Sequence, residues 1–190
     1  MDNLERYDSP AGSFDSDFDT DDGANSLTGY TLKKAISREM ETFCCMNDDL
    51  ESGYHCQGDF EVFSTGKTST LPLKRFVERM MKYLSCSNSA YVVAFCYIHR
   101  IMEHQKDLRI CTQNSENLLF AATVTAVKYL EDRVHTNAFY AKVGGLSGYM
   151  EMNRLEAQFL KLMNFDLAVS SEEYRTMESY LSGVGAKELK

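Results

Sequence analysis

Residues 118–130 read Leu-Leu-Phe-Ala-Ala-Thr-Val-Thr-Ala-Val-Lys-Tyr-Leu, a stretch too apolar to face water on any side. A helix that is hydrophobic all round is buried in the core of a protein. The residues at the centre of this stretch are small, so neighbouring helices can approach its backbone closely. The stretch therefore predicts a central buried helix, which we expect to span 116–131 and to begin after a cap at Asn114 or Ser115.

Two lone charges lie in apolar surroundings. Lys128 lies near the end of the central stretch, and Glu156 shares its own helix face with Met152, Phe159, Leu160 and Met163. Charges in such surroundings are costly unless they are paired. Either the two neutralise each other, or they await groups from a partner. A third interpretation pairs Lys128 within its own helix with Glu131 or Asp132, three and four residues ahead.

Apolar residues at helical spacing predict helices along most of the chain after residue 29, and no strand pattern competes. The expected segments are 31–46, 73–84, 90–103, 137–143 before Gly144 and Gly145, one after Ser147, and one after a capping box at Ser170 and Glu173. Residues 47–70 are rich in Gly, Ser, Thr and Asp and are expected to form a loop. The pattern predicts an all-α fold, a small orthogonal bundle of five helices around a central buried helix, with an extra N-terminal helix.

Composition divides the chain into four parts. Residues 1–29 hold eight acidic residues and one basic residue, so they carry seven of the eight net negative charges. This segment has few branched apolar residues, and we expect a disordered acidic tail. The remaining parts are a helix and loop at 30–71, the bundle at 72–182 and a C-terminal tail at 183–190. The near-neutral body lacks the basic stripe of a nucleic-acid binder.

Neither a metal site nor a catalytic centre is predicted. Cys44, Cys45, His55 and Cys56 cluster loosely, but their spacing is not that of paired zinc ligands. No signature surrounds any cysteine or histidine as a nucleophile or base. We therefore expect no metal, no cofactor and no catalytic residue.

No stretch of the sequence is long and apolar enough to predict a membrane span. The N-terminus also lacks the basic and apolar regions of a secretory signal. We expect a cytoplasmic or nuclear protein without membrane partners.

Several motifs together resemble a cyclin box. They are Tyr97-Ile98-His99-Arg100-Ile101, the stretch from Ala121 to Asp132, Tyr140-Ala141-Lys142-Val143-Gly144-Gly145-Leu146-Ser147, Leu155-Glu156 and Asn164-Phe165-Asp166-Leu167. The variant is similar to a single box of the P/U type, related to cyclins of the fungal phosphate-starvation response. The resemblance covers about 72–182, and the segment from Tyr140 to Gly145 is its most distinctive part.

The resemblance implies a regulatory subunit that binds and activates a cyclin-dependent serine/threonine protein kinase, in nutrient and phosphate signalling or in cell-cycle control. In cyclins, the residues matching Lys128 and Glu156 hydrogen-bond the kinase backbone near its mobile helix. The resemblance assigns the apolar part of the kinase-facing patch to Tyr129, Leu160, Phe165 and Leu167. Asp132 is placed to meet arginines of the kinase activation segment. No small-molecule cofactor is implied.

Two departures from the family pattern matter. Most cyclins pair an arginine of the first box helix with an aspartate of the second, but here the residues are Arg79 and His99, so this site should be weaker or rearranged. The substrate-docking patch of cell-cycle cyclins is also missing, because Lys82 and Ser85 stand where apolar groups are needed. The alternative function is a transcription factor or adaptor protein of the same fold, against which the near-neutral body argues.

Overall fold

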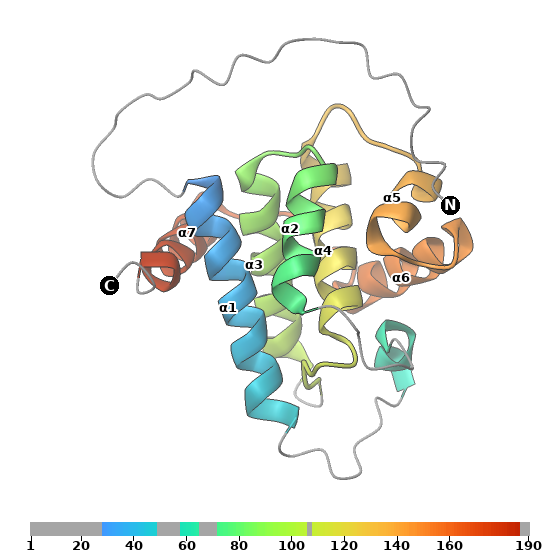
Figure 1. Cartoon of the computed structure of the whole chain (residues 1–190), viewed down its shortest axis with the longest axis horizontal. Helices are drawn as coiled ribbons and strands as arrows, with labels where there is room; N and C mark the ends of the chain where they lie inside the picture. The colour runs from blue at the N-terminus through green and yellow to red at the C-terminus, as the bar shows by residue number, and fades with distance from the viewer. Residues whose placement is uncertain (1–27, 49–57, 65–71, 106–107, 187–190) are drawn as a thin grey trace.

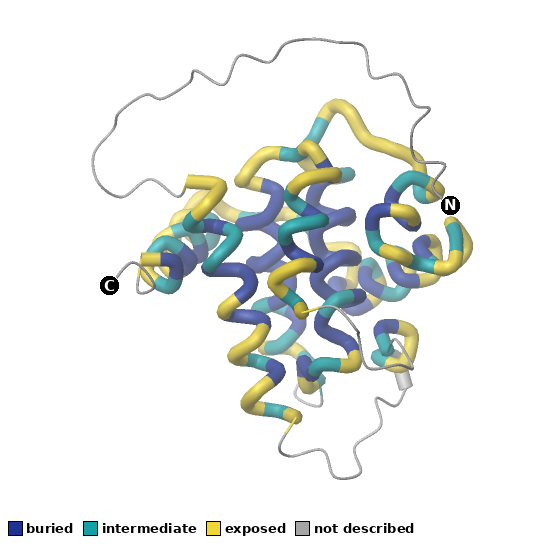
Figure 2. The backbone as a smooth tube through the Cα atoms, in the orientation of Figure 1, coloured by how far each residue is buried: buried dark blue, intermediate teal, exposed yellow. Residues whose placement is uncertain are grey.

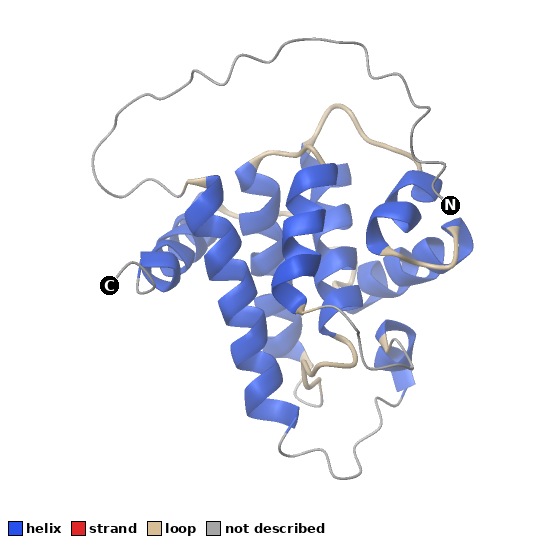
Figure 3. Ribbon diagram, in the orientation of Figure 1, coloured by secondary structure: helices blue, strands red, loops and turns tan. Residues whose placement is uncertain are grey.

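The structure, a computed structural model, describes residues 28–48, 58–64, 72–105 and 108–186, and most of these are helical (Figures 1 and 3). The helices are α1 (Gly29–Asp48), the 3₁₀ helix η1 (Gly58–Phe63), α2 (Leu73–Tyr83), α3 (Asn88–His104), α4 (Ser115–Leu130), α5 (Asn137–Gly144), α6 (Tyr149–Leu162) and α7 (Ser171–Ala186). The described ranges contain no strand. The predicted all-α class, with an extra helix before the bundle, is confirmed.

Helix α4 is the centre of the bundle. Every residue from Asn117 to Val127 is buried, as the dark tube in Figure 2 shows. Its small residues, such as Ala121 and Ala122, are fully buried, and α3 packs along it. Helices α1 and α7 pack together at one end of the molecule, and α5 and α6 pack together at the other (Figure 1). The helix therefore holds the central place that its composition predicts, and it ends at Leu130.

The glycine pair after α5 ends that helix as expected. Gly145 has a φ of 73°, the left-handed conformation that glycine adopts without steric cost. The next residue, Leu146, donates its N–H to the carbonyl of Ala141 at 2.9 Å. A Cβ on Gly144 would lie 2.6 Å from the Phe120 ring, so the pair allows a tight turn and a close approach to α4.

The predicted loop at 47–70 contains a helical segment that the sequence does not reveal. Helix η1 buries Phe63, whose carbonyl accepts a hydrogen bond of 3.1 Å from the Asn117 side chain of α4. The six residues of η1 are too few for a helical period to be visible in the sequence. Residues 49–57 and 65–71 lie outside the described part of the chain.

The predicted boundary of the C-terminal tail at 182 falls inside α7, which continues to Ala186. Gly185 is buried, and a Cβ there would lie 2.7 Å from the carbonyl oxygen of Thr31 in α1. Helix α7 thus still contacts α1 beyond the end of its apolar stripe. At the other terminus, the acidic segment predicted at 1–29 lies outside the described residues except for its last two positions.

Candidate functional site

Lys128 and Glu156 meet at the junction of three helices. The Lys128 ammonium, at the end of α4, lies 2.6 and 2.7 Å from the two carboxylate oxygens of Glu156 on α6. It also donates to the Asn137 Oδ1 atom, at the start of α5, at 2.7 Å. The ammonium lies 5.7 Å from the centre of the Tyr140 ring, close enough for a cation–π contact. The two lone charges of the sequence therefore neutralise each other.

Two asparagines complete this network. Asn137 donates through Nδ2 to Glu156 at 2.8 Å and to Asn153 of α6 at 2.6 Å. The side chains of Lys128 and Glu156 nevertheless keep 27% and 18% of their surface exposed. The pair is thus complete within the chain and still reachable from outside. Sequence reasoning missed both asparagines, because a single polar residue on a helix with an exposed face, as Asn153 is, or at a helix start, as Asn137 is, stands out from no pattern.

The alternative pairing of Lys128 within its own helix is wrong. Glu131 instead accepts a hydrogen bond of 2.9 Å from the backbone N–H of Ser87, before α3. Hydrogen bonds from Ser87 lower the pKa of the Glu131 carboxyl, since they favour its charged form. Asp132 is exposed just beyond the end of α4. Its role toward a kinase stays a prediction.

Apolar side chains are exposed on the helices that carry the ion pair and in the segment after α6. Tyr129 is 51% exposed and Phe165 is 68% exposed, whereas Leu160 and Leu167 are half-buried. Tyr129 and Leu167 also line a groove of about 460 Å³ between the end of α4 and the start of α7. We call the following set the α4–α6 face: Lys128, Tyr129, Glu156, Leu160, Phe165 and Leu167. Large exposed apolar residues are typical of protein-binding surfaces.

Phe165 is held in an unusual backbone conformation. Its φ is 58° and that of Asn164 is 50°, in the left-handed region that residues with a Cβ seldom adopt. The Phe165 N–H donates to the carbonyl of Leu160 at 2.9 Å, which closes the end of α6. Such backbone strain is concentrated at functional sites.

Arg79 and His99 do not form the paired site of the family pattern but face different neighbours. The Arg79 guanidinium lies over the Phe76 ring, 5.4 Å from its centre, and approaches Gly145 at the end of α5. The His99 ring packs against Phe43 of α1 and Tyr180 of α7, with ring centres 6.0 and 5.8 Å apart. Burial lowers the pKa of His99. Arg79 and His99 therefore have separate neighbours in this structure.

Metal-binding and nucleophilic groups do not gather in the described residues. No three of the His, Cys, Asp and Glu side chains in those ranges come together as metal ligands, while His55 and Cys56 lie outside them. Burial raises the pKa of Cys44, and it raises the pKa of Cys96 to about 12, so both stay thiols at neutral pH. No helix of the described residues is both long and apolar enough to cross a membrane.

Comparison with known proteins identifies the class. The family model described as Cyclin matches residues 26–167, so the chain belongs to the cyclin family. Members of this family are in general regulatory subunits. The match includes α1, which lies before the expected bounds of the box at 72–182.

The relatives place the chain within the family. It is 33% identical over 143 residues to Cyclin-U4-2 of Arabidopsis thaliana, covering 75% of this chain and 64% of that protein. It is 39% identical over 120 residues to Cyclin-U4-1 of the same plant, covering 63% and 59%. It is 41% identical over 95 residues to Cyclin-P4-1 of Oryza sativa subsp. japonica, covering 50% and 44%. The chain is a P/U-type cyclin that spans about 64% and 59% of the two U4 relatives.

Proposed function

We propose that this cyclin binds and activates a cyclin-dependent serine/threonine protein kinase through the α4–α6 face. The observation that carries the proposal is the Lys128–Glu156 pair, which is held by three helices and yet remains accessible. A partly exposed ion pair adds little to the stability of the fold, because surface ion pairs contribute about 0–1 kcal/mol. Stability alone therefore does not account for an ordered pair at this position. Tyr129, the next residue after Lys128, and Phe165, just after α6, are both exposed and would supply the apolar area that stable association requires.

Each charge has a distinct part in this proposal. The Glu156 carboxylate accepts three hydrogen bonds within the chain, which leaves one of its about four lone-pair positions for an N–H group of the kinase backbone. The Lys128 ammonium directs its donors at Glu156 and Asn137. A kinase carbonyl that takes the place of the Asn137 oxygen would keep all of the Lys128 donors satisfied.

The mechanism is conformational. The α4–α6 face would hold the mobile helix of the kinase in the position that aligns ATP, and so shift the kinase toward its active arrangement. Asp132, exposed at the end of α4, would pair with arginines of the activation segment and stand in for an activating phosphate. On the resemblance to cyclins of the fungal phosphate-starvation response, we assign the complex to nutrient and phosphate signalling or to cell-cycle control.

Reconstitution tests the proposal. The purified chain is mixed with each member of a panel of cyclin-dependent kinases, and phosphate transfer to a serine/threonine peptide is measured. We expect activity of at least one kinase to rise well above that of the kinase alone. A transcription factor or adaptor of the same fold would leave all the kinases inactive, and that result would exclude the proposed function.

A further inference from the structure

Two side chains of helix α3 donate hydrogen bonds to three consecutive carbonyl groups in the segment that follows Phe165. Arg100 donates through Nη1 to the carbonyl of Asp166 at 2.8 Å and through Nη2 to that of Ala168 at 3.0 Å. Between them, the Tyr97 hydroxyl donates to the carbonyl of Leu167 at 2.9 Å. The backbone of 166–168 is therefore bound, residue by residue, to two side chains one turn apart on α3.

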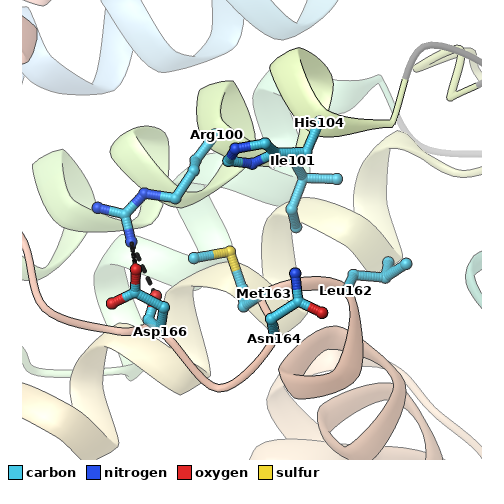
Figure 4. Close-up of a pocket in the computed structure, with 7 residues that line it drawn as sticks. All are labelled: Arg100, Ile101, His104, Leu162, Met163, Asn164 and Asp166. Carbon is cyan, nitrogen blue, oxygen red and sulfur yellow. Dashed lines mark hydrogen bonds and ion pairs between the residues drawn. The ribbon is translucent and has the colours of Figure 1, made fainter.

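Arg100 is itself fixed from the other side. Its Nη2 atom lies 2.9 and 2.8 Å from the two carboxylate oxygens of Glu173, in the first turn of α7. The Asp166 carboxylate lies 3.9 Å from Nη1, and Figure 4 shows Arg100 directed at this residue beside a cavity of about 200 Å³. Because only 16% of the Arg100 side chain is exposed, a partner has little of it to contact.

The predicted capping box at Ser170 and Glu173 is only half formed, because Glu173 pairs with Arg100. Ser170 accepts a hydrogen bond of 3.1 Å from the Glu173 N–H, as a cap should. The Glu173 carboxylate, however, pairs with Arg100, because a charged guanidinium is a stronger partner than a backbone amide. The beginning of α7 is thereby tied to α3 through the same arginine.

Residues 166–168, which α3 binds, directly follow a strained part of the backbone. Two successive left-handed residues, Asn164 and Phe165, precede it, and such residues persist only where their surroundings determine the backbone. The amide N–H groups of Phe165 and Asp166 are hydrogen-bonded to carbonyls of the α6 end, at 2.9 Å each. The hydrogen bonds to Arg100 and Tyr97 hold the chain immediately after this turn.

We propose that Arg100, supported by Tyr97, is a positioning residue that holds Phe165 in its exposed, binding-ready conformation. Arg100 does not touch the partner; it acts by ordering the segment before binding, so that association does not have to restrict it. This inference rests on the proposed function for its effect on kinase binding, but its effect on the free chain is independent of any partner.

Hydrogen exchange on the free chain tests the first part. In Arg100→Gln, the amides of Phe165 and Asp166 should exchange about tenfold to a hundredfold faster, the range expected for the loss of a hydrogen bond from a charged donor. Amides in the centre of α4 should keep their wild-type rates. Arg38→Gln, the same change at an exposed arginine of α1, is the matched control and should alter neither region. Unchanged exchange at Phe165 and Asp166 in a folded Arg100→Gln chain would overturn the proposal.

A double-mutant cycle tests the second part. Arg100→Gln should weaken kinase binding about tenfold when Phe165 is present and should have almost no further effect in a Phe165→Ala chain. Equal losses in both backgrounds would show that Arg100 acts through something other than Phe165, and the proposal would be wrong. If no kinase binds the wild-type chain, the proposed function fails while the exchange result still decides the positioning role. Should Arg100→Gln not fold, Tyr97→Phe removes one donor to the same segment and undergoes both tests.

Discussion

Two lysine–glutamate pairs at different ends of the molecule have the same chemistry and different settings. Lys128 and Glu156 approach to 2.6 Å and share Asn137, and exposed Tyr129 follows Lys128 directly in the sequence. Lys33 of α1 and Glu78 of α2 are 3.7 Å apart, and the lysine lies 5.7 Å from the centre of the Tyr30 ring. The exposed fractions of the two lysines are almost equal, 27% and 28%.

The difference lies in what surrounds each pair. Three helices meet at Lys128 and Glu156, and hydrogen bonds fix both side chains, which reduces the entropy that a partner must remove on binding. The Lys33–Glu78 pair joins two helices that already pack together, and its 3.7 Å separation is typical of a weak surface contact. Exposure alone does not mark a binding site. A charge pair that is ordered by its neighbours and set among apolar groups does.

The largest expected effect follows from removing either member of the first pair. Lys128→Ala and Glu156→Ala should each weaken kinase binding by about 2–5 kcal/mol, the typical loss when one partner of an interfacial charge pair is truncated. Each should change the free energy of unfolding by only about 1 kcal/mol, since the pair is partly exposed and alanine is favourable in helices. Titration calorimetry and thermal melts measure the two quantities.

Lys33→Ala and Glu78→Ala are the matched controls for this prediction. They should leave kinase binding unchanged and alter stability by less than about 1 kcal/mol. The double variant Lys128→Ala with Glu156→Ala should lose less binding than the sum of the single losses, because the two residues share partners. Normal kinase activation by folded Lys128→Ala and Glu156→Ala chains would remove this pair from the binding site.

Sequence was sufficient for the central parts of this comparison. The apolar stretch at 118–130 predicted the buried α4, and the isolation of Lys128 and Glu156 among apolar residues marked both as a site. It was not sufficient for Asn137 or Arg100, because their importance depends on which atoms lie near them in space. The same limit applies to η1, where burial of Phe63 depends on α4, and to the C-terminal turn of α7, which packs on α1.

A smaller effect is expected at Asn137, which links the pair to α5. Asn137→Ala removes hydrogen bonds to Lys128 and Glu156 and should destabilise the fold by about 1 kcal/mol. Kinase binding should weaken less than in Lys128→Ala, because both charges remain. Asn153→Ala, at the exposed edge of the network, is the control and should have a smaller effect on both measurements. A loss of binding in Asn153→Ala as large as in Asn137→Ala would show that order around the pair does not decide its function.

His99 lies between α1 and α7 and, unlike the accessible charges of the α4–α6 face, is largely enclosed by its neighbours. Its ring is enclosed by Phe43 and Tyr180, with Glu39 and Glu103 nearby, and burial lowers its pKa. Below about pH 6.5 the unfolded chain takes up a proton at this residue before the folded chain does. The free energy of unfolding should therefore decrease as the pH is lowered, by at most about 1.4 kcal/mol per pH unit. Above that pH this contribution is constant.

Urea unfolding at several values between pH 5.5 and 7.5 measures this slope. His99→Gln, which cannot titrate, should have a lower stability throughout and a flatter dependence on pH. Kinase binding by the folded variant at pH 7.5 should equal that of the wild type, since His99 is not part of the α4–α6 face. An unchanged slope in His99→Gln would show that other groups cause the acid sensitivity.

We expect no substrate-peptide binding at the exposed end of α2. The α4–α6 face would then be the partner surface of the described residues. Lys82 is exposed over the Tyr83 ring, and Ser85 is exposed with a φ of 47°. A lysine and a serine provide no apolar pocket for the leucine of an arginine-x-leucine substrate peptide. Such peptides should bind the cyclin–kinase complex no better than scrambled peptides in fluorescence anisotropy. Saturable binding of micromolar affinity, abolished by Tyr83→Ala but not by Tyr129→Ala, would instead establish a second docking surface on α2.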